Sequence, residues 1–233
     1  MLYIVSTPIG SVEEISMQAL KILLNSDVIL AEDTRSFDRL YKSAQKLYGL
    51  VTDKKQQIIS YYKDNEFEKL PEVISLLEQD KIVSLVSEAG TPLISDPGSL
   101  LVQACMRKGL SYSAIPGSVA FVNAAILAGK SFDQLMFLGF LPRKQSDQNR
   151  LFRNIEKVAM EFPGCLFSFY ASPMRIYDTA ALILSDYPDF DITIVREMNK
   201  MYEEVLPVTA ENVEELKKIK GEITVVMKKR HNR

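Results

Sequence analysis

Short apolar runs alternate with longer amphipathic segments through the first half of the chain. At Glu13–Leu24 and Leu70–Gln79 the apolar positions recur at helical spacing, which predicts helices that bury one face. Buried strands, rich in Val, Ile and Tyr, are predicted at Leu2–Ser6, Val28–Ala31, Ile58–Tyr61, Ile82–Val86 and Tyr112–Ile115. This alternation is typical of βαβ units around a largely parallel sheet.

A second series of strands and helices follows Pro116 and Gly117, where the pattern is interrupted. Its predicted elements are a helix at Val119–Leu127, a strand at Leu135–Gly139, a helix at Gln148–Glu161, a strand at Cys165–Tyr170, a helix at Met174–Leu184, a strand at Asp191–Arg196 and a last pair at Val213–Lys218 and Ile223–Met227. We therefore expect an α/β protein of two domains, residues 1–116 and 117–233, with mixed, mostly parallel sheets and flanking helices.

Composition narrows the class of protein. The 233 residues are 47% hydrophobic and 25% charged, which is ordinary for a globular protein, and the formal net charge is −2. Any contact with a polyanion must therefore come from local basic patches. The N-terminus has no basic segment of a signal peptide and no apolar run is long enough to span a bilayer, so we expect a cytoplasmic protein. The single histidine, His231, is expected to be a solvated residue of the tail.

Loops that follow strands hold the candidate chemistry, because ligands of open α/β sheets bind beyond the carboxyl ends of the strands. Four such loops stand out: Ser6–Gly10, Glu32–Arg35, Ser87–Gly98 and Ile115–Phe121. The third is the most informative, since a long loop with two glycines and two prolines is built for rigidity rather than for mere connection. Its Gly90 allows the main chain to approach a ligand closely.

Each of the other loops also has a purely structural interpretation. Ser6–Gly10 is equally compatible with a plain turn between strand and helix. Asp33 or Thr34 can cap the next helix while Arg35 faces solvent, or a carboxylate and Arg35 can project toward a substrate. Ser118 is most simply the cap of a helix.

Common cofactor and hydrolase motifs are missing. Ala128–Ser131 resembles the end of a phosphate-binding P-loop, but that motif needs a glycine where the chain has Ala124. The sequence has no G-x-G-x-x-G, no H-E-x-x-H, and no histidine placed for a Ser/His/Asp triad. We therefore expect neither a metal site nor a hydrolase.

Seven collinear motifs give the chain a resemblance to one family. They are Leu2–Gly10, Ala31–Arg35, Ser87–Gly98, Ile115–Gly117, Phe137–Arg143, Phe169–Arg175 and Arg196–Lys200. Over nearly its whole length the chain resembles the tetrapyrrole methylase superfamily, above all the branch that methylates the 2′-hydroxyl of a cytidine in 16S ribosomal RNA. The resemblance implies two α/β domains with S-adenosylmethionine in the cleft between them, and a homodimer.

The resemblance also implies roles for individual residues. The cofactor pocket would include Pro8, Ala89, Gly90, Thr91, Ile94, Val119, Ala120, Tyr170 and Ala171. Methyl transfer to a ribose hydroxyl is helped by a base, and the candidates are Glu88, Glu32 and Asp33, with Tyr170 orienting the acceptor.

Contact with RNA would need local positive charge. Arg143 and Lys144, together with Arg35, are the candidate substrate-binding residues. Further basic residues occur at Arg150, Arg153, Lys228, Lys229, Arg230 and Arg233. The alternative interpretation of both groups is an ordinary solvated surface.

The sequence is compatible with three functions. The first is an S-adenosylmethionine-dependent methyltransferase acting on 16S ribosomal RNA in the small subunit. The second is a methyltransferase of the same fold acting on a small molecule such as a tetrapyrrole. The third is a degenerate relative without catalysis, which binds the cofactor, or a partner through a dimer face. They stay open because several substrate-side positions depart from the family's usual residues, such as Ala171 in place of glutamate and Met174 in place of histidine.

Overall fold

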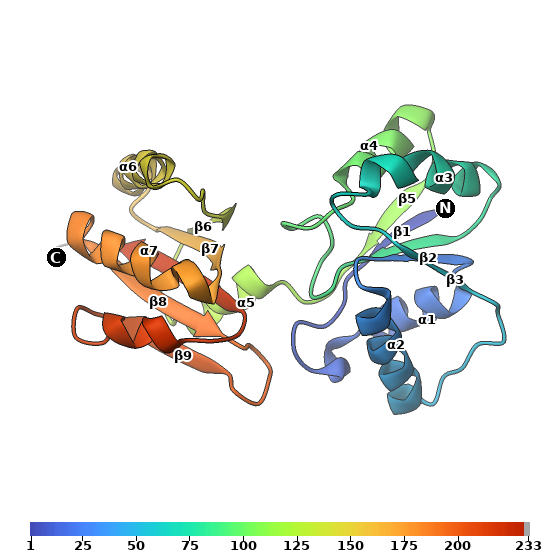
Figure 1. The fold of residues 1–233 in the computed structure, drawn as a ribbon, viewed down its shortest axis with the longest axis horizontal. Helices are drawn as coiled ribbons and strands as arrows, with labels where there is room; N and C mark the ends of the chain where they lie inside the picture. The colour runs from blue at the N-terminus through green and yellow to red at the C-terminus, as the bar shows by residue number, and fades with distance from the viewer. Residues whose placement is uncertain (231–233) are drawn as a thin grey trace. The chain divides into compact units, whose positions relative to one another are not determined.

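The computed structural model describes residues 1–230. His231 and Arg233, which the sequence placed in a solvated tail and a basic patch, lie outside the described residues. Contacts within the chain divide it into two compact units, Met1–Val119 and a second one that begins at Ala120. Figure 1 shows both units, and each is described by itself below.

The first unit is built on a five-stranded, fully parallel sheet. Its order is β3-β2-β4-β1-β5, with strands at β1 (Leu2–Val5), β2 (Val28–Ala31), β3 (Gln57–Ser60), β4 (Val83–Val86) and β5 (Tyr112–Ile115). All residues of β2 and β4 are buried, which explains why both strands are apolar except at Ser84, whose hydroxyl lies 2.7 Å from that of Ser26. Because the strands are parallel, the loops that follow them meet at one edge, here called the carboxyl edge.

Helices cover both faces of this sheet (Figure 1). α1 (Met17–Asn25) and α2 (Thr34–Tyr48) share one core cluster, and α3 (Glu66–Glu78) and α4 (Ser99–Lys108) share the other. The helix predicted from Glu13 is divided into a 3₁₀ turn, η1 (Val12–Glu14), and α1. The division falls at Ser16, whose side chain accepts a hydrogen bond from the Ala19 N–H and so caps a new helix.

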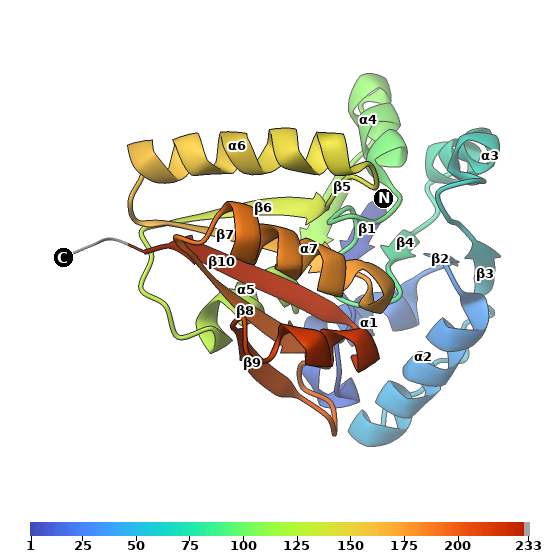
Figure 2. The ribbon, with the colours of Figure 1, turned by 60° about the vertical axis from the view of Figure 1, so that its left-hand side comes forward.

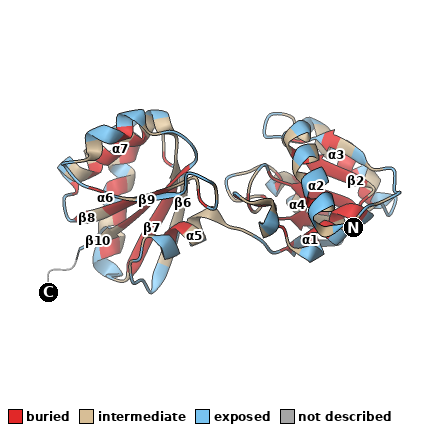
Figure 3. Ribbon diagram, turned by 90° about the horizontal axis from the view of Figure 1, so that it is seen from below, coloured by how far each residue is buried: buried red, intermediate tan, exposed pale blue. Residues whose placement is uncertain are grey.

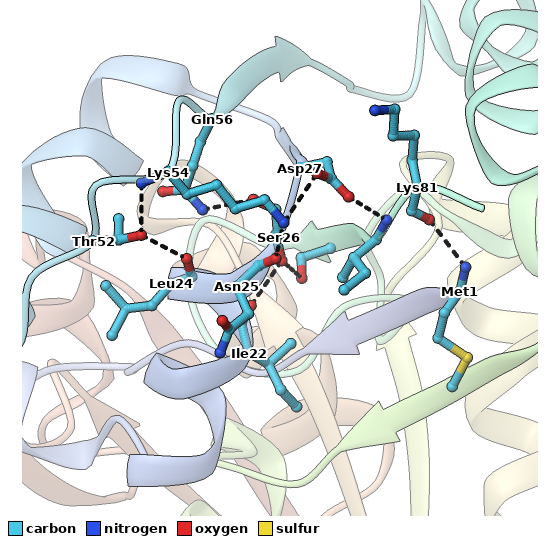
Figure 4. A network of polar contacts seen from close by, with 12 residues as sticks. Met1, Ile22, Leu24, Asn25, Ser26, Asp27, Thr52, Lys54, Gln56 and Lys81 are labelled. Atoms are coloured by element: carbon cyan, nitrogen blue, oxygen red, sulfur yellow. Dashed lines mark hydrogen bonds and ion pairs between the residues drawn. The ribbon is translucent and has the colours of Figure 1, made fainter. Parts of the chain in front are cut away.

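The opposite, amino edge of this sheet is closed by a polar network (Figure 4). Asp27 accepts a hydrogen bond of 2.7 Å from the Ile82 N–H and forms an ion pair of 2.9 Å with Lys54. Gln56 donates to the carbonyls of Leu23 and Ser26, which fastens the segment before β3 to the end of α1. These contacts satisfy main-chain groups at the strand starts, so the network is structural in character.

The second unit holds a mixed five-stranded sheet of order β6-β7-β10-β8-β9. Its strands are β6 (Gln134–Phe140), β7 (Cys165–Ala171), β8 (Phe190–Arg196), β9 (Glu204–Val208) and β10 (Ile223–Lys229). Only β6 and β7 pair in parallel, and the other three pairings are antiparallel. The α/β class is confirmed, but this sheet is less parallel than expected.

Three helices and a 3₁₀ segment accompany this second sheet. α6 (Gln145–Glu161), α7 (Pro173–Asp186) and η2 (Val213–Lys218) pack into one cluster on one face, and α5 (Ala120–Leu127) contacts β7 and β10. Figure 2 shows α6 and α7 along the sheet. Figure 3 shows that buried residues line the inside of each unit, so each unit has its own core.

Candidate functional site

Two of the predicted loops lie side by side at the carboxyl edge of the first sheet. The Thr7 N–H donates a hydrogen bond of 2.8 Å to the Gly90 carbonyl, and the Gly90 N–H donates one of 3.3 Å to the Pro8 carbonyl. Pro8 and Gly90 are both buried. The loop after β1 and the loop after β4 are therefore joined directly by main-chain hydrogen bonds.

A chain of hydroxyl groups links these two loops to the segment after β5. Ser6 Oγ lies 2.9 Å from Thr91 Oγ1 and donates to the Ile115 carbonyl at 3.0 Å. Thr91 Oγ1 in turn lies 3.1 Å from the carbonyl of Ser118. Three predicted loops, from β1, β4 and β5, are thus held as one body by short polar contacts.

Glu14 fixes the loop after β1, although the helical pattern around it had indicated no such role. Its carboxylate accepts hydrogen bonds of 2.8–2.9 Å from the N–H groups of Ile9, Gly10 and Ser11, and one of 2.7 Å from Ser118 Oγ. The signal in the sequence is a capping box, with Ser11 as the N-cap and glutamate three residues later. Because the turn is fixed before any ligand arrives, little entropy is lost on binding.

The loop after β4 stores backbone strain. Gly90 adopts a φ of +84°, and a Cβ placed there would lie 3.3 Å from both Ile9 Cγ2 and the Ser118 carbonyl oxygen. Leu93 and Ser95, which carry side chains, both adopt a φ of 70°. Such conformations cost of order 1–3 kcal/mol each and cluster at functional sites. The strain supports the prediction that this loop is functional.

Three carboxylates gather where β2 and β4 end. Burial, followed by the charge of Glu32, raises the pKa of Asp96 to about 6. Burial and the charge of Glu88 also raise the pKa of Glu32. Within residues 1–230, no lysine or arginine is among the causes of either pKa shift. The sequence marked Asp96 as an acid of the loop but indicated no role for it.

Asp33 and Arg35 do not join this cluster. Asp33 is the N-cap of α2, and its Oδ1 accepts hydrogen bonds from the N–H groups of Arg35 and Ser36 at 2.8 and 3.0 Å. These bonds lower the pKa of Asp33, which makes its carboxylate a weaker base. Arg35 is exposed in the first turn of the helix. We therefore assign Asp33 to helix capping and leave it out of the catalytic proposal.

The remaining cofactor candidates are divided between the two units. Ala89, Thr91, Ile94 and Val119 are half-buried in the first unit. Ala120 begins α5 in the second unit. There, Tyr170 and Ala171 end β7, where the Tyr170 ring packs edge-on against Phe137 at 4.8 Å and Phe140 at 5.5 Å.

The basic residues also differ in their surroundings. Arg143 and Lys144 are exposed in the segment between β6 and α6, at the start of that helix. Lys228 and Lys229 belong to β10 rather than to a tail, since Lys228 donates to the Ser131 carbonyl and Lys229 pairs with Glu156 at 3.6 Å. These two lysines are thus committed to contacts within the second unit.

Among the described residues, no group of three His, Cys, Asp or Glu side chains is arranged to hold a metal ion. No helix within residues 1–230 has the length and apolar character needed to cross a membrane.

The chain is similar to known proteins along nearly its whole length. Residues 1–214 match the family model of the tetrapyrrole (corrin/porphyrin) methylases. A ribosomal RNA small subunit methyltransferase I of Hydrogenobaculum sp. is 38% identical over 232 residues, which is 98% of this chain and 95% of the relative. The protein of the same name from Thermotoga maritima is 36% identical over 97% of both chains.

Solved structures share the fold at much lower identity. A diphthine synthase structure has a TM-score of 0.67 at 17% identity and covers 99% of this chain and 90% of its own. A uroporphyrin-III C-methyltransferase from Thermus thermophilus, complexed with S-adenosylhomocysteine, has a TM-score of 0.65 at 14% identity and covers 97% of this chain and 96% of its own. At these identities the likeness establishes the fold alone.

Proposed function

The chain belongs to the tetrapyrrole methylase family, and from that premise we propose that it transfers the methyl group of S-adenosylmethionine to a ribose 2′-hydroxyl of a cytidine in small-subunit ribosomal RNA. The observation that carries this proposal is the 38% identity to a ribosomal RNA small subunit methyltransferase I over 95% of that relative. A match of this extent leaves no large segment of the relative without a counterpart.

The carboxyl edge of the first sheet suits a cationic methyl donor. The cluster of Glu32, Glu88 and Asp96 includes raised pKa values at Glu32 and Asp96, and no lysine or arginine is among the causes of the shifts. A ligand that carries a sulfonium and an ammonium group would supply the missing positive charge, and the carboxylates can accept hydrogen bonds from ribose hydroxyls. We place the donor beside Gly90 and Thr91, whose main chain is held rigid by the contacts described above.

S-adenosylmethionine supplies a methyl group that the sulfonium already activates. The chain's own task is therefore to orient the acceptor oxygen, to exclude water and to take up a proton. In the reaction the C–S bond breaks and the O–CH₃ bond forms, and the proton of the acceptor hydroxyl passes to a carboxylate. We propose Glu88 as that carboxylate, because it is exposed at the mouth of the loop, with Glu32 and Asp96 beside it. Tyr170 is proposed to orient the acceptor.

A transfer assay tests this function. The purified chain is incubated with tritiated S-adenosylmethionine and with small ribosomal subunits from a strain that lacks the corresponding methyltransferase. We expect label in the ribosomal RNA of these subunits and none in subunits from the parent strain. In a parallel reaction the chain is given a tetrapyrrole as acceptor, and label there with none in the ribosomal RNA would overturn the RNA assignment. Binding without transfer to any acceptor would indicate a degenerate relative.

A further inference from the structure

A cavity of about 630 Å³ lies in the second unit, apart from the residues assigned to the methyl donor. The segment before α6, the start of α6 and one face of α7 line it. Its volume falls within the range of roughly 300–1,000 Å³ that is usual for ligand sites. Its walls include Arg143, Gln148, Arg175, Asp178, Thr179 and Asp186.

Two guanidinium groups reach this cavity from different segments. Arg143 precedes α6, and Arg175 lies in the first turn of α7. Among residues 1–230, neither lies within 4.0 Å of a carboxylate, whereas Arg150 pairs with Asp147 at 3.2 Å. Two arginines without a carboxylate partner that line one cavity can bind a phosphate group with two or more charge-assisted hydrogen bonds.

The cationic end of the cavity is held in place before any ligand binds. Arg175 Nη1 donates to the Leu141 carbonyl at 3.4 Å, and the buried Gln148 donates through Nε2 to the Pro142 carbonyl at 2.7 Å. Both bonds fasten the segment that carries Arg143.

The first turns of α6 and α7 also lie at this end of the cavity. Neither N-cap residue makes a side-chain cap, so the positive ends of two helix dipoles add to the positive potential of the arginines.

The two carboxylates of the lining form no ion pair with Arg143 or Arg175 among the described residues. Asp186 follows Arg175 by eleven residues on α7, so at 1.5 Å per residue it lies about 16 Å away along the helix axis. Asp178 is one turn from Arg175 but makes no ion pair with it in the described chain. Thr179 and Leu182 lie between the two ends, so the wall beyond the arginines has apolar and hydroxyl groups suited to a sugar or a base.

We propose that this cavity binds one nucleotide of the RNA substrate, with its phosphate between Arg143 and Arg175 and its sugar and base along α7. The proposal rests on the function proposed above and adds Arg175 and a defined subsite to it. The site recognises the RNA backbone, so it positions the substrate and takes no part in the transfer of the methyl group.

The test uses the full chain with Arg175→Gln and Arg143→Gln, and with Arg150→Gln as the matched control on α6. Binding to the single-stranded target segment of the RNA is titrated at several salt concentrations. Each of the first two variants should bind about tenfold more weakly, and the slope of log K against log salt should fall by about 0.7 for each phosphate that the variant no longer neutralises. The KM for small subunits should rise, while kcat and the affinity for S-adenosylmethionine stay at wild-type values.

Further arms keep the proposal falsifiable. Arg175→Lys should restore the salt slope but only part of the affinity, because an ammonium group keeps the charge and loses the paired geometry. If Arg175→Gln fails to fold, Arg143→Gln decides, since the Arg143 side chain is exposed. Wild-type affinity and slope in Arg143→Gln, or an equal loss in Arg150→Gln, would overturn this inference alone. Failure of the wild-type chain to bind the RNA would overturn the proposed function as well.

Discussion

Gly90 combines a positive φ with main-chain hydrogen bonds to a neighbouring loop. Its φ of +84° lies in a region that residues with a side chain rarely adopt, and its main chain forms hydrogen bonds with both Thr7 and Pro8. The backbone of Ser118 is also close to Gly90, because a Cβ at Gly90 would lie 3.3 Å from the Ser118 carbonyl oxygen. The position therefore controls how three loops approach one another at the carboxyl edge.

Gly90→Ala is expected to weaken the binding of S-adenosylmethionine about tenfold, because the added Cβ pushes the loops after β1 and β5 away from the loop after β4. Gly109→Ala is the matched control, since Gly109 also has a positive φ, of +66°, but a Cβ there meets nothing within 4 Å. Both variants should lose about 1 kcal/mol of stability. Calorimetric titration gives the affinities, and equal cofactor affinities in the two variants would show that Gly90 has no special role in the site.

At the scale of elements, the sequence indicated most strands and helices because their apolar periodicity is strong. β9 is not predicted because it contains Pro207 and two further exposed residues, Glu204 and Val205, a composition that the edge strand of a sheet tolerates. The sequence predicts α2 only through the candidate N-caps Asp33 and Thr34, since the chain from Thr34 to Tyr48 is mostly polar and buries few residues. The site was harder to foresee, because the acidic cluster depends on which strands become neighbours, and β2 and β4 are far apart in the sequence.

The amino edge of the first sheet offers a prediction about stability. The Ile82 N–H and Lys54 hold the pKa of Asp27 below its usual value, so the ionised carboxylate stabilises the folded state. This contribution is present above the pKa of about 3.9 in the unfolded chain, and it is lost as the pH falls through the lower pKa of the folded state. Asp27→Asn should therefore cost about 1 kcal/mol near pH 7, and the difference from wild type should vanish in acid.

Hydrogen exchange of peptides that cover β2 and β4 measures this change locally. Asp38→Asn serves as the control, because the ion pair of Asp38 with Lys42 is exposed and is expected to contribute less than about 0.5 kcal/mol. A cost for Asp27→Asn that stays constant from neutral pH into strong acid would contradict the role given to the charged carboxylate.

At the scale of the whole molecule, we assign a different ligand to each of the two units. The first unit holds the strained loop and the acidic cluster, and we assign the methyl donor to it. The second unit holds Tyr170 and the cavity beside Arg143 and Arg175, and we assign the RNA to it. Family membership fixes the class of reaction, while the acceptor atom is the claim that most needs a direct measurement.

Alkaline hydrolysis of the labelled ribosomal RNA measures that atom. Alkali cleaves RNA through the free 2′-hydroxyl, so a nucleotide methylated there stays joined to its neighbour as a resistant dinucleotide. We predict that the tritium transferred by the wild-type chain is recovered in such dinucleotides, with cytidine as the 5′ nucleoside. Recovery of the tritium in mononucleotides would place the methyl group on a base and contradict the account.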